Sequence, residues 1–300
     1  MSNHTRIALP ARTRAGITPR RASLFTTLTC AGALAGLAGL APAALAQEAM
    51  YTASATMPGP GNTLIRTQSH IFRFGSDPTD GTRNTTVYSV WNTVQLGLAR
   101  DLSLTIDAPV EVENTTLASG QHDTNTKVPD VDFTFKYRFY RSDTGGVDTT
   151  RAALLGGVKL DTGGEFNADP HLGVVLTQVS GRHGWNAELH YTLTTGGTED
   201  RLDNFGGEGT ADALMYNLAY VYRLYPSAYT SESTGAWYAT AEINGLYETN
   251  SDNEIHFSPG IMYEGRRFGF EVMGKLPIYS DVNNRAELDW AIGMGFRLLF

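Results

Sequence analysis

Apolar and polar residues alternate in a series of short segments from residue 63 to the end of the chain, and clusters of Gly, Asp, Asn, Ser and Thr separate these segments. Successive side chains of a strand point to opposite faces, so the alternation predicts strands with one apolar and one polar face. Each segment has the length of a transmembrane strand, about ten residues. We predict twelve strands: 63–74, 85–98, 101–112, 130–140, 151–161, 171–180, 184–194, 213–225, 236–247, 254–264, 267–279 and 286–300.

The segment 130–140 shows the two faces clearly. Phe133, Phe135 and Tyr137 fall on one side, and Lys136 and Arg138 fall on the other. The first and sixth segments alternate less regularly. The last segment places its apolar residues on a single face: Leu288, Trp290, Ile292, Met294, Phe296, Leu298 and Phe300.

The connections between these segments alternate in length. Residues 99–101, 181–183 and 264–266 form tight turns, whereas 75–84, 113–129, 162–170 and 195–212 form longer loops. This pattern is typical of outer-membrane barrels, which have short periplasmic turns and longer external loops. We therefore predict an all-β fold, an antiparallel transmembrane β-barrel of about 12 strands. The alternative is a soluble periplasmic β-sandwich, whose strands also alternate.

The final segment has a second feature. Its apolar face ends at Phe300, with Leu298 and Phe296 at the two preceding positions of that face. A terminal aromatic residue after alternating apolar residues resembles the insertion signal of bacterial outer-membrane barrels. We predict that Phe300, Leu298 and Phe296 form this signal.

The first 46 residues have a different pattern. Five arginines and no acidic residue precede an apolar run from Leu24 to Leu40, and small residues follow up to Ala46. These are the parts of a secretory signal peptide, and we predict cleavage after Ala46. A retained membrane helix is disfavoured by the glycines of the run and by Pro42. The protein is thus expected in the cell outer membrane, and residues 47–62 form either a small plug in the barrel or a periplasmic tail.

Charge and cysteine content exclude other classes of protein. The chain has 23 basic and 31 acidic residues, and removal of the signal peptide leaves 18 basic residues and a net charge of −13. Nucleic-acid binding needs a basic surface, so a nucleic-acid partner is excluded. The single cysteine, Cys30, lies in the predicted signal peptide, so the mature chain has neither disulfides nor thiol chemistry.

The stretch 154–164, Leu-Leu-Gly-Gly-Val-Lys-Leu-Asp-Thr-Gly-Gly, continues into Pro170-His171-Leu172-Gly173 and the Trp-led segment 184–191. It resembles the family of outer-membrane barrels named for the MetA pathway of phenol degradation. Asp161 departs from the proline that is more usual there. The resemblance implies a porin-like barrel for small solutes, including aromatic or other small organic compounds, and it implies no catalytic or binding residues.

The predicted inner face of the barrel is rich in charge. The candidates to line a pore are Asp107, Asp132, Lys136, Lys159, Glu188, Glu242, Glu271, Lys275, Asp289 and Arg297. A wet pore would use such residues to select solutes. In a barrel of this size they could instead pair across the lumen and fill it. The first reading predicts a channel or facilitator for passive uptake, and the second a structural or interaction barrel that acts through its external loops.

Enzymatic activity is not expected, because the sequence lacks the common hydrolase, metalloprotease and phosphate-binding motifs. The minor alternative is a phospholipase-like hydrolase built on His256 and Ser258, which share a strand face. We expect no cofactor and no metal. The expected partners are outer-membrane lipid, lipopolysaccharide, the barrel assembly machinery and a small-molecule solute.

Overall fold

The computed structural model describes residues 48–144, 147–162, 167–195 and 211–300. The predicted signal peptide and most of the predicted loop 195–212 lie outside these residues. The strands are β1 (Thr63–Phe74), β2 (Asn84–Ala99), β3 (Leu102–Thr116), β4 (His122–Lys127), β5 (Val131–Thr144), β6 (Asp148–Leu160), β7 (Ala168–Ser180), β8 (His183–Thr192), β9 (Ala213–Tyr225), β10 (Gly235–Glu248), β11 (Asn253–Gly265), β12 (Phe268–Asp281) and β13 (Leu288–Leu299). None of the described residues forms a helix that could span a membrane.

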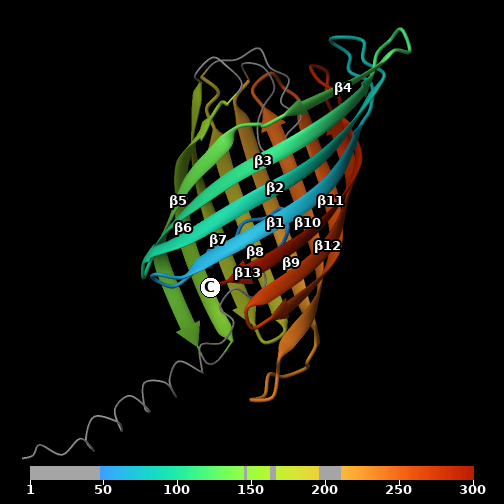
Figure 1. The fold of residues 1–300 in the computed structure, drawn as a ribbon. Helices are drawn as coiled ribbons and strands as arrows, with labels where there is room; N and C mark the ends of the chain where they lie inside the picture. The colour runs from blue at the N-terminus through green and yellow to red at the C-terminus, as the bar shows by residue number, and fades with distance from the viewer. Residues whose placement is uncertain (1–47, 145–146, 163–166, 196–210) are drawn as a thin grey trace, which may run out of the picture. The chain divides into compact units, whose positions relative to one another are not determined.

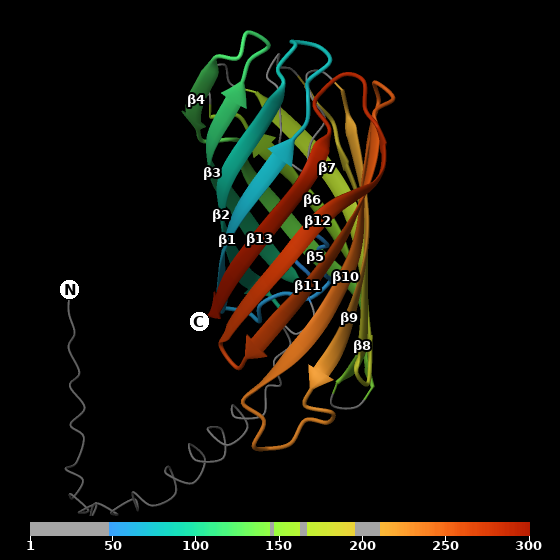
Figure 2. The same cartoon turned by 90° about the vertical axis from the view of Figure 1, so that its right-hand side faces the viewer.

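Twelve of these strands form a closed antiparallel barrel, which confirms the predicted fold class (Figure 1). The ring runs from β1 through β13 and down in order to β5, then through β3 and β2 back to β1. Closure is made where β1 pairs with both β13 and β2 (Figure 2). A closed sheet leaves no unpaired edge within its wall, which is the condition for strands to cross a membrane.

The barrel has two distinct ends. At the turn end, β2 and β3, β7 and β8, and β11 and β12 are joined by very short connections, and Phe300 exchanges backbone hydrogen bonds with Thr63. At the loop end lie the strand ends that are joined by the connections from β1 to β2, β6 to β7, β8 to β9 and β12 to β13. The three predicted tight turns therefore lie at the opposite end from the predicted longer loops, as expected for an outer-membrane barrel. Two connections depart from this pattern: 226–234, between β9 and β10, is long and lies at the turn end, and 249–252, between β10 and β11, is short and lies at the loop end.

The predicted loop 113–129 is wrong in part. β3 continues to Thr116, and β4 pairs with its outer half, so this stretch is a hairpin that projects at the loop end (Figure 1). The hairpin has no apolar face from which the alternation could be recognised. Its strands are instead rich in threonine, a residue that favours the extended backbone: Thr115, Thr116, Thr124 and Thr126.

The two faces of the wall have opposite chemistry. Phe135 is 49% exposed on the outside of the barrel, whereas the next residue, Lys136, is 4% exposed on the inside. The other strands repeat this arrangement, and Leu172 on β7 reaches 66% exposure. Large apolar side chains therefore cover the outside, and most buried charged side chains lie inside, which is the reverse of a soluble protein.

Candidate functional site in the barrel lumen

The structure places nine of the ten predicted pore-lining residues on the inner face of the wall. Seven are buried there: Lys136, Lys159, Glu188, Glu242, Glu271, Lys275 and Arg297. Asp107 and Asp132 are half-buried opposite each other on β3 and β5. These side chains come from strands around the ring and not from one sector.

The prediction that Asp289 lies on the inner face is wrong. A β-bulge shifts the register between β1 and β13, so that Arg73 pairs with Trp290 and Phe74 pairs with Leu288. The extra residue is Asp289, whose side chain is exposed, and Leu288 is buried in its place. A bulge inverts the faces beyond it, because it adds one residue to a repeat of two.

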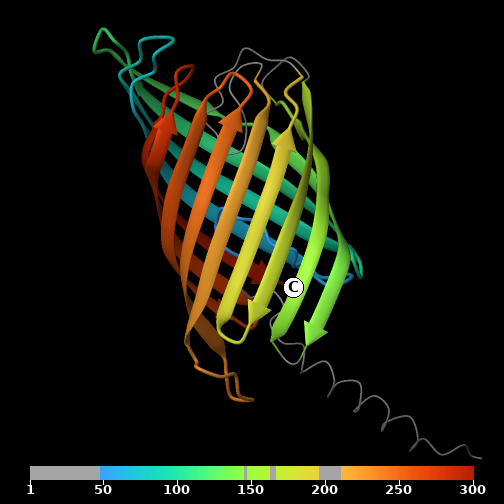
Figure 3. The same ribbon diagram turned by 180° about the vertical axis from the view of Figure 1, so that it is seen from behind.

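Residues 48–58 cross the lumen, and we call this segment the N-terminal arch. Its two ends lie toward the turn end: the Glu48 carbonyl accepts from Arg297, and the following residues reach Gly97 on β2. Its middle, around Tyr51, contacts His70 near the middle of β1 and Glu242 near the middle of β10. The segment is seen inside the barrel in Figure 3. The arch is almost entirely buried.

Two wall carboxylates accept hydrogen bonds from the arch. Glu242 accepts from the backbone N–H groups of Met50 at 3.0 Å and Tyr51 at 3.2 Å, and from the Thr52 hydroxyl. Glu188, on β8, accepts from the Ala53 N–H at 2.9 Å. The arch has no strand partner, so these carboxylates satisfy donors that a sheet would otherwise satisfy.

Wall donors bind the carbonyl groups of the arch. Lys136 Nζ donates to Ser54 O at 2.7 Å and to Thr56 O at 3.3 Å. Asn217 Nδ2 donates to Tyr51 O at 3.2 Å, and Arg66 donates to Ala49 O at 3.2 Å. Several predicted pore-lining residues are thus the residues that hold the arch.

Apolar contacts and two glycines complete the fit of the arch. Ala49 packs among Ala219, Val221, Ala236, Tyr238 and Met262, and Ala55 packs against Ala153, Leu155 and Val175. A Cβ atom at Gly293 would come within 2.6 Å of His70 Nδ1 and 2.9 Å of the Met50 sulfur. At Gly97 it would collide with the backbone of Gly59. The glycines therefore make room for the arch.

Ion pairs join neighbouring strands around the arch. Glu271 binds Arg66 at 2.7 Å and Arg297 at 3.0 Å near the turn end. Near the loop end, Arg285 binds Glu248 at 2.7 Å and Glu254 at 3.1 Å. Both signs of charge occur in each group, so neither group presents charge of one sign alone to the lumen.

The turn between β2 and β3 has its own ion pair. Arg138 donates to Asp101 at 2.7 Å. This hydrogen bond from the guanidinium is the main cause that lowers the pKa of the Asp101 carboxyl.

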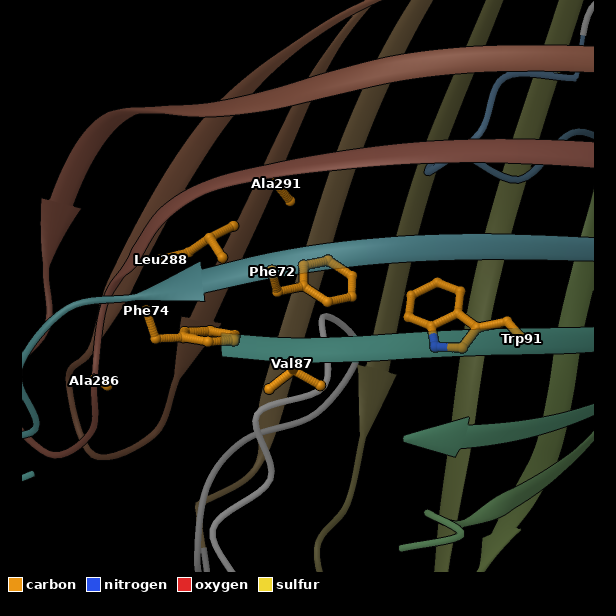
Figure 4. Close-up of a cluster of buried hydrophobic side chains, with 7 residues drawn as sticks. All are labelled: Phe72, Phe74, Val87, Trp91, Ala286, Leu288 and Ala291. Atoms are coloured by element: carbon orange, nitrogen blue, oxygen red, sulfur yellow. The ribbon is translucent and has the colours of Figure 1, made fainter. Parts of the chain in front are cut away.

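Toward the loop end, one sector of the inner wall is apolar and aromatic. Figure 4 shows the side chains that form this aromatic cluster: Phe72, Phe74, Val87, Trp91, Ala286, Leu288 and Ala291. His70 links the cluster to the arch. Its ring lies 4.5 Å from that of Trp91 and 5.3 Å from that of Phe72, and its Nδ1 is 3.3 Å from the Tyr51 hydroxyl.

The pair His256 and Ser258 lies on the inner face of β11, and both side chains are buried. The Ser258 hydroxyl donates to Asn244 Oδ1 at 2.7 Å, and His256 Nε2 faces Glu254 at 3.4 Å. The serine proton therefore points to an amide and not to a general base. Lipid outside the barrel cannot reach either side chain. Within the described residues, no group of three or more His, Cys, Asp or Glu side chains is arranged to hold a metal ion.

Sequence reasoning missed the aromatic cluster and the contacts of the arch. The cluster was missed because β1 carries apolar residues on both faces, such as Ile71 outside and Phe72 inside. The arch has no period to detect, since its backbone is held by side chains from distant strands. The buried threonines and small residues of 49–56 are the only local signal that this segment packs inside.

Comparisons with known proteins bear on the fold. No family model and no curated protein matches the chain. Among solved structures, an outer membrane channel from Pseudomonas putida F1 matches with a TM-score of 0.54 at 12% identity, covering 85% of this chain and 99% of that one. The β domain of the Bordetella autotransporter BrkA matches with a TM-score of 0.47 at 13% identity, over 80% and 100% of the two chains.

The likeness to the Pseudomonas channel shows a shared barrel fold. At 12% identity it shows no more than the fold. The resemblance to the phenol-degradation family stays a prediction, because no family model supports it.

Proposed function

We propose that this protein is an outer-membrane channel for passive uptake of small solutes, exported behind its N-terminal signal peptide. The observation that carries the proposal is the division of the wall into an apolar outside and a charged inside. Lipid solvates the first face and water the second. A soluble protein with large apolar side chains exposed on nearly every strand would tend to aggregate, because soluble monomers rarely expose extended apolar patches.

The arch defines the kind of channel. It occupies the middle of the lumen and binds wall residues on β1, β5, β8, β9 and β10. We infer that it narrows the path, so that small solutes pass and large ones do not. Its polar contacts are of a kind that water can replace, which is compatible with a wet pore.

Aromatic and other small organic compounds are the solutes we favour. The aromatic cluster places apolar side chains on the inner wall toward the loop end, where a solute would enter from outside the cell. These side chains are at most 9% exposed, so a solute would bind among them by replacing some of their present contacts. Such a wall removes apolar solute surface from water, and edge-to-face or stacked ring contacts add to the attraction. Sugars and inorganic ions gain little from such a surface.

The proposal is tested with purified protein in planar lipid bilayers. We expect discrete conductance steps, and we expect a small aromatic solute to reduce the ionic current as it occupies the lumen. A glucose-sized polar solute of similar volume is the control and should reduce the current less. Equal effects of the two solutes would contradict the preference for aromatic compounds while leaving the channel in place.

A structural or interaction barrel is the second candidate, and the filling of the lumen by the arch favours it. In this case the external loops and the projecting β3–β4 hairpin would carry the function, with lipopolysaccharide or another cell-surface molecule as partner. A protein that is folded in the bilayer and silent at all voltages would support this candidate and overturn the channel.

A further inference from the structure

Among the described residues, the outer wall carries one polar patch in the middle of its apolar surface. Thr67 and Ser69 of β1 and Asn92 of β2 are all exposed on the outside of the barrel. Asn92 lies near the middle of β2. The side chains around the patch are large and apolar, among them Val90, Met294 and Phe296.

The hydrogen bonding of the patch is incomplete within one chain. Thr67 lies opposite Asn92 in the register, and its hydroxyl donates to Asn92 Oδ1 at 3.2 Å. This bond uses one of the two acceptor sites of the amide oxygen. An asparagine also has two N–H donors, and the exposed side chain must find their acceptors outside its own barrel.

Hydrocarbon offers no acceptor. A polar group left without a hydrogen bond in an apolar medium is strongly disfavoured, so an amide in the middle of a lipid-facing wall is costly. Asparagine and threonine at such positions commonly form hydrogen bonds between membrane-embedded elements. The patch is therefore suited to a partner that is itself in the membrane.

We propose that a second copy of this chain docks on the patch formed by Thr67, Ser69 and Asn92. This inference rests on the proposed placement of the barrel in a membrane. All copies insert with the same orientation and depth, so a twofold axis along the membrane normal brings each patch against itself. An amide is self-complementary, because its N–H donors match its own oxygen acceptor on the other copy.

The shape of the patch supports this occupant. Its side chains are small, and Ala108 of β3 lies opposite Asn92 in the register. Small residues let two walls approach closely enough for amides to meet, as they do between transmembrane helices. The larger side chains at the border, such as Met294, then pack around the contact.

The test is disulfide cross-linking in the membrane. The single natural cysteine, Cys30, lies in the predicted signal peptide, so an introduced cysteine is unique in the mature chain. Asn92→Cys should form a disulfide-linked dimer on mild oxidation. The matched control is Ala187→Cys on the outer face of β8, which lies across the barrel in strand order. Dimer at the same level from both variants would overturn the proposal.

A second variant measures the amide itself. Asn92→Leu keeps the barrel fold, because the position faces outward, and should weaken dimerisation by about tenfold. The readout is the ratio of dimer to monomer by native mass spectrometry from detergent, with heat-modifiable mobility as the check of folding. An unchanged ratio would overturn the role of Asn92. If the wild-type protein is folded in the outer membrane and monomeric, the dimer proposal is wrong and the channel proposal is unaffected. If the wild-type protein is found in the soluble periplasmic fraction, both proposals are wrong.

Discussion

At the scale of single residues, neighbours in the sequence lie on opposite faces of the wall, one outside the barrel and one inside it. Phe135 and Lys136 are adjacent on β5, with the first side chain outside and the second inside, bound to two carbonyl groups of the arch. The same alternation explains how a chain with only 41% hydrophobic residues covers most of the outside of a barrel with apolar side chains. Every second residue is enough.

The first prediction compares these two neighbours. Phe135→Arg places a charge against lipid and should lower the free energy of unfolding by about 2–4 kcal/mol if the position is near the midplane. Lys136→Gln should leave folding nearly intact, because a glutamine amide can still donate to the arch. Urea unfolding of the barrel in lipid vesicles measures both. The reverse ranking would mean that the faces of β5 are exchanged.

At the scale of strands, the end of β13 closes the barrel. Phe300 donates to Thr63 O at 2.9 Å and accepts from Thr63 N at 3.1 Å, and its ring is exposed on the outside. A large aromatic ring at this position suits the interface between the bilayer and water. The backbone hydrogen bonds of Phe300 thus join the end of β13 to the start of β1, and its aromatic side chain lies on the outside of this junction.

The second prediction concerns this strand end. Phe300→Asp keeps the backbone able to pair but puts a carboxylate where an apolar ring should contact lipid. We expect assembly to fall strongly, measured as the abundance of heat-modifiable protein in the outer membrane. Phe300→Trp is the matched control and should assemble normally. Normal abundance of the aspartate variant would refute a role of the ring in insertion.

The strands show what the sequence can and cannot predict. All twelve predicted strands correspond to barrel strands. Each strand has one face outside and one face inside the barrel, and these two environments require apolar and polar residues in alternation. The bulge at Asp289 and the β3–β4 hairpin were not predictable in this way. A bulge depends on the register with the neighbouring strand, and the hairpin has no apolar face. The alternation of apolar and polar residues therefore predicts the strands, whereas the register with neighbouring strands determines where that alternation shifts.

The lumen was predictable only as a list of candidates. Nine of the ten charged residues lie on the inner face, but their partners could not be known from sequence. Glu242 illustrates the reason: its partners Met50 and Tyr51 are 192 and 191 residues away in the chain. Contacts at such separation depend on closure of the ring.

At the scale of the whole molecule, the barrel and the arch are held together by different interactions. Backbone hydrogen bonds between neighbouring strands close the ring, and none of the strand pairs includes a residue of the arch. The arch is bound by side chains of the wall, chiefly Glu242, Glu188 and Lys136. We therefore expect the wall to form without the arch, whereas the shape of the arch depends on the wall.

The last prediction follows from this division. Deletion of residues 48–57 should leave a folded barrel with a larger single-channel conductance, because water replaces the arch and satisfies the wall residues it contacted. Glu242→Ala in the full-length chain is the second arm. It removes the acceptor of three donors at the middle of the arch and should raise the conductance less than the deletion does. Glu113→Ala, whose partner Lys127 belongs to the projecting hairpin, is the control and should change nothing. If both lumen variants fold, as shown by heat-modifiable mobility, and conduct like the wild type, the arch does not limit the path. If the deletion variant fails to fold, the Glu242→Ala variant still tests whether the arch limits the path. It keeps every strand of the ring and changes one side chain, so its conductance can be compared directly with that of the wild type.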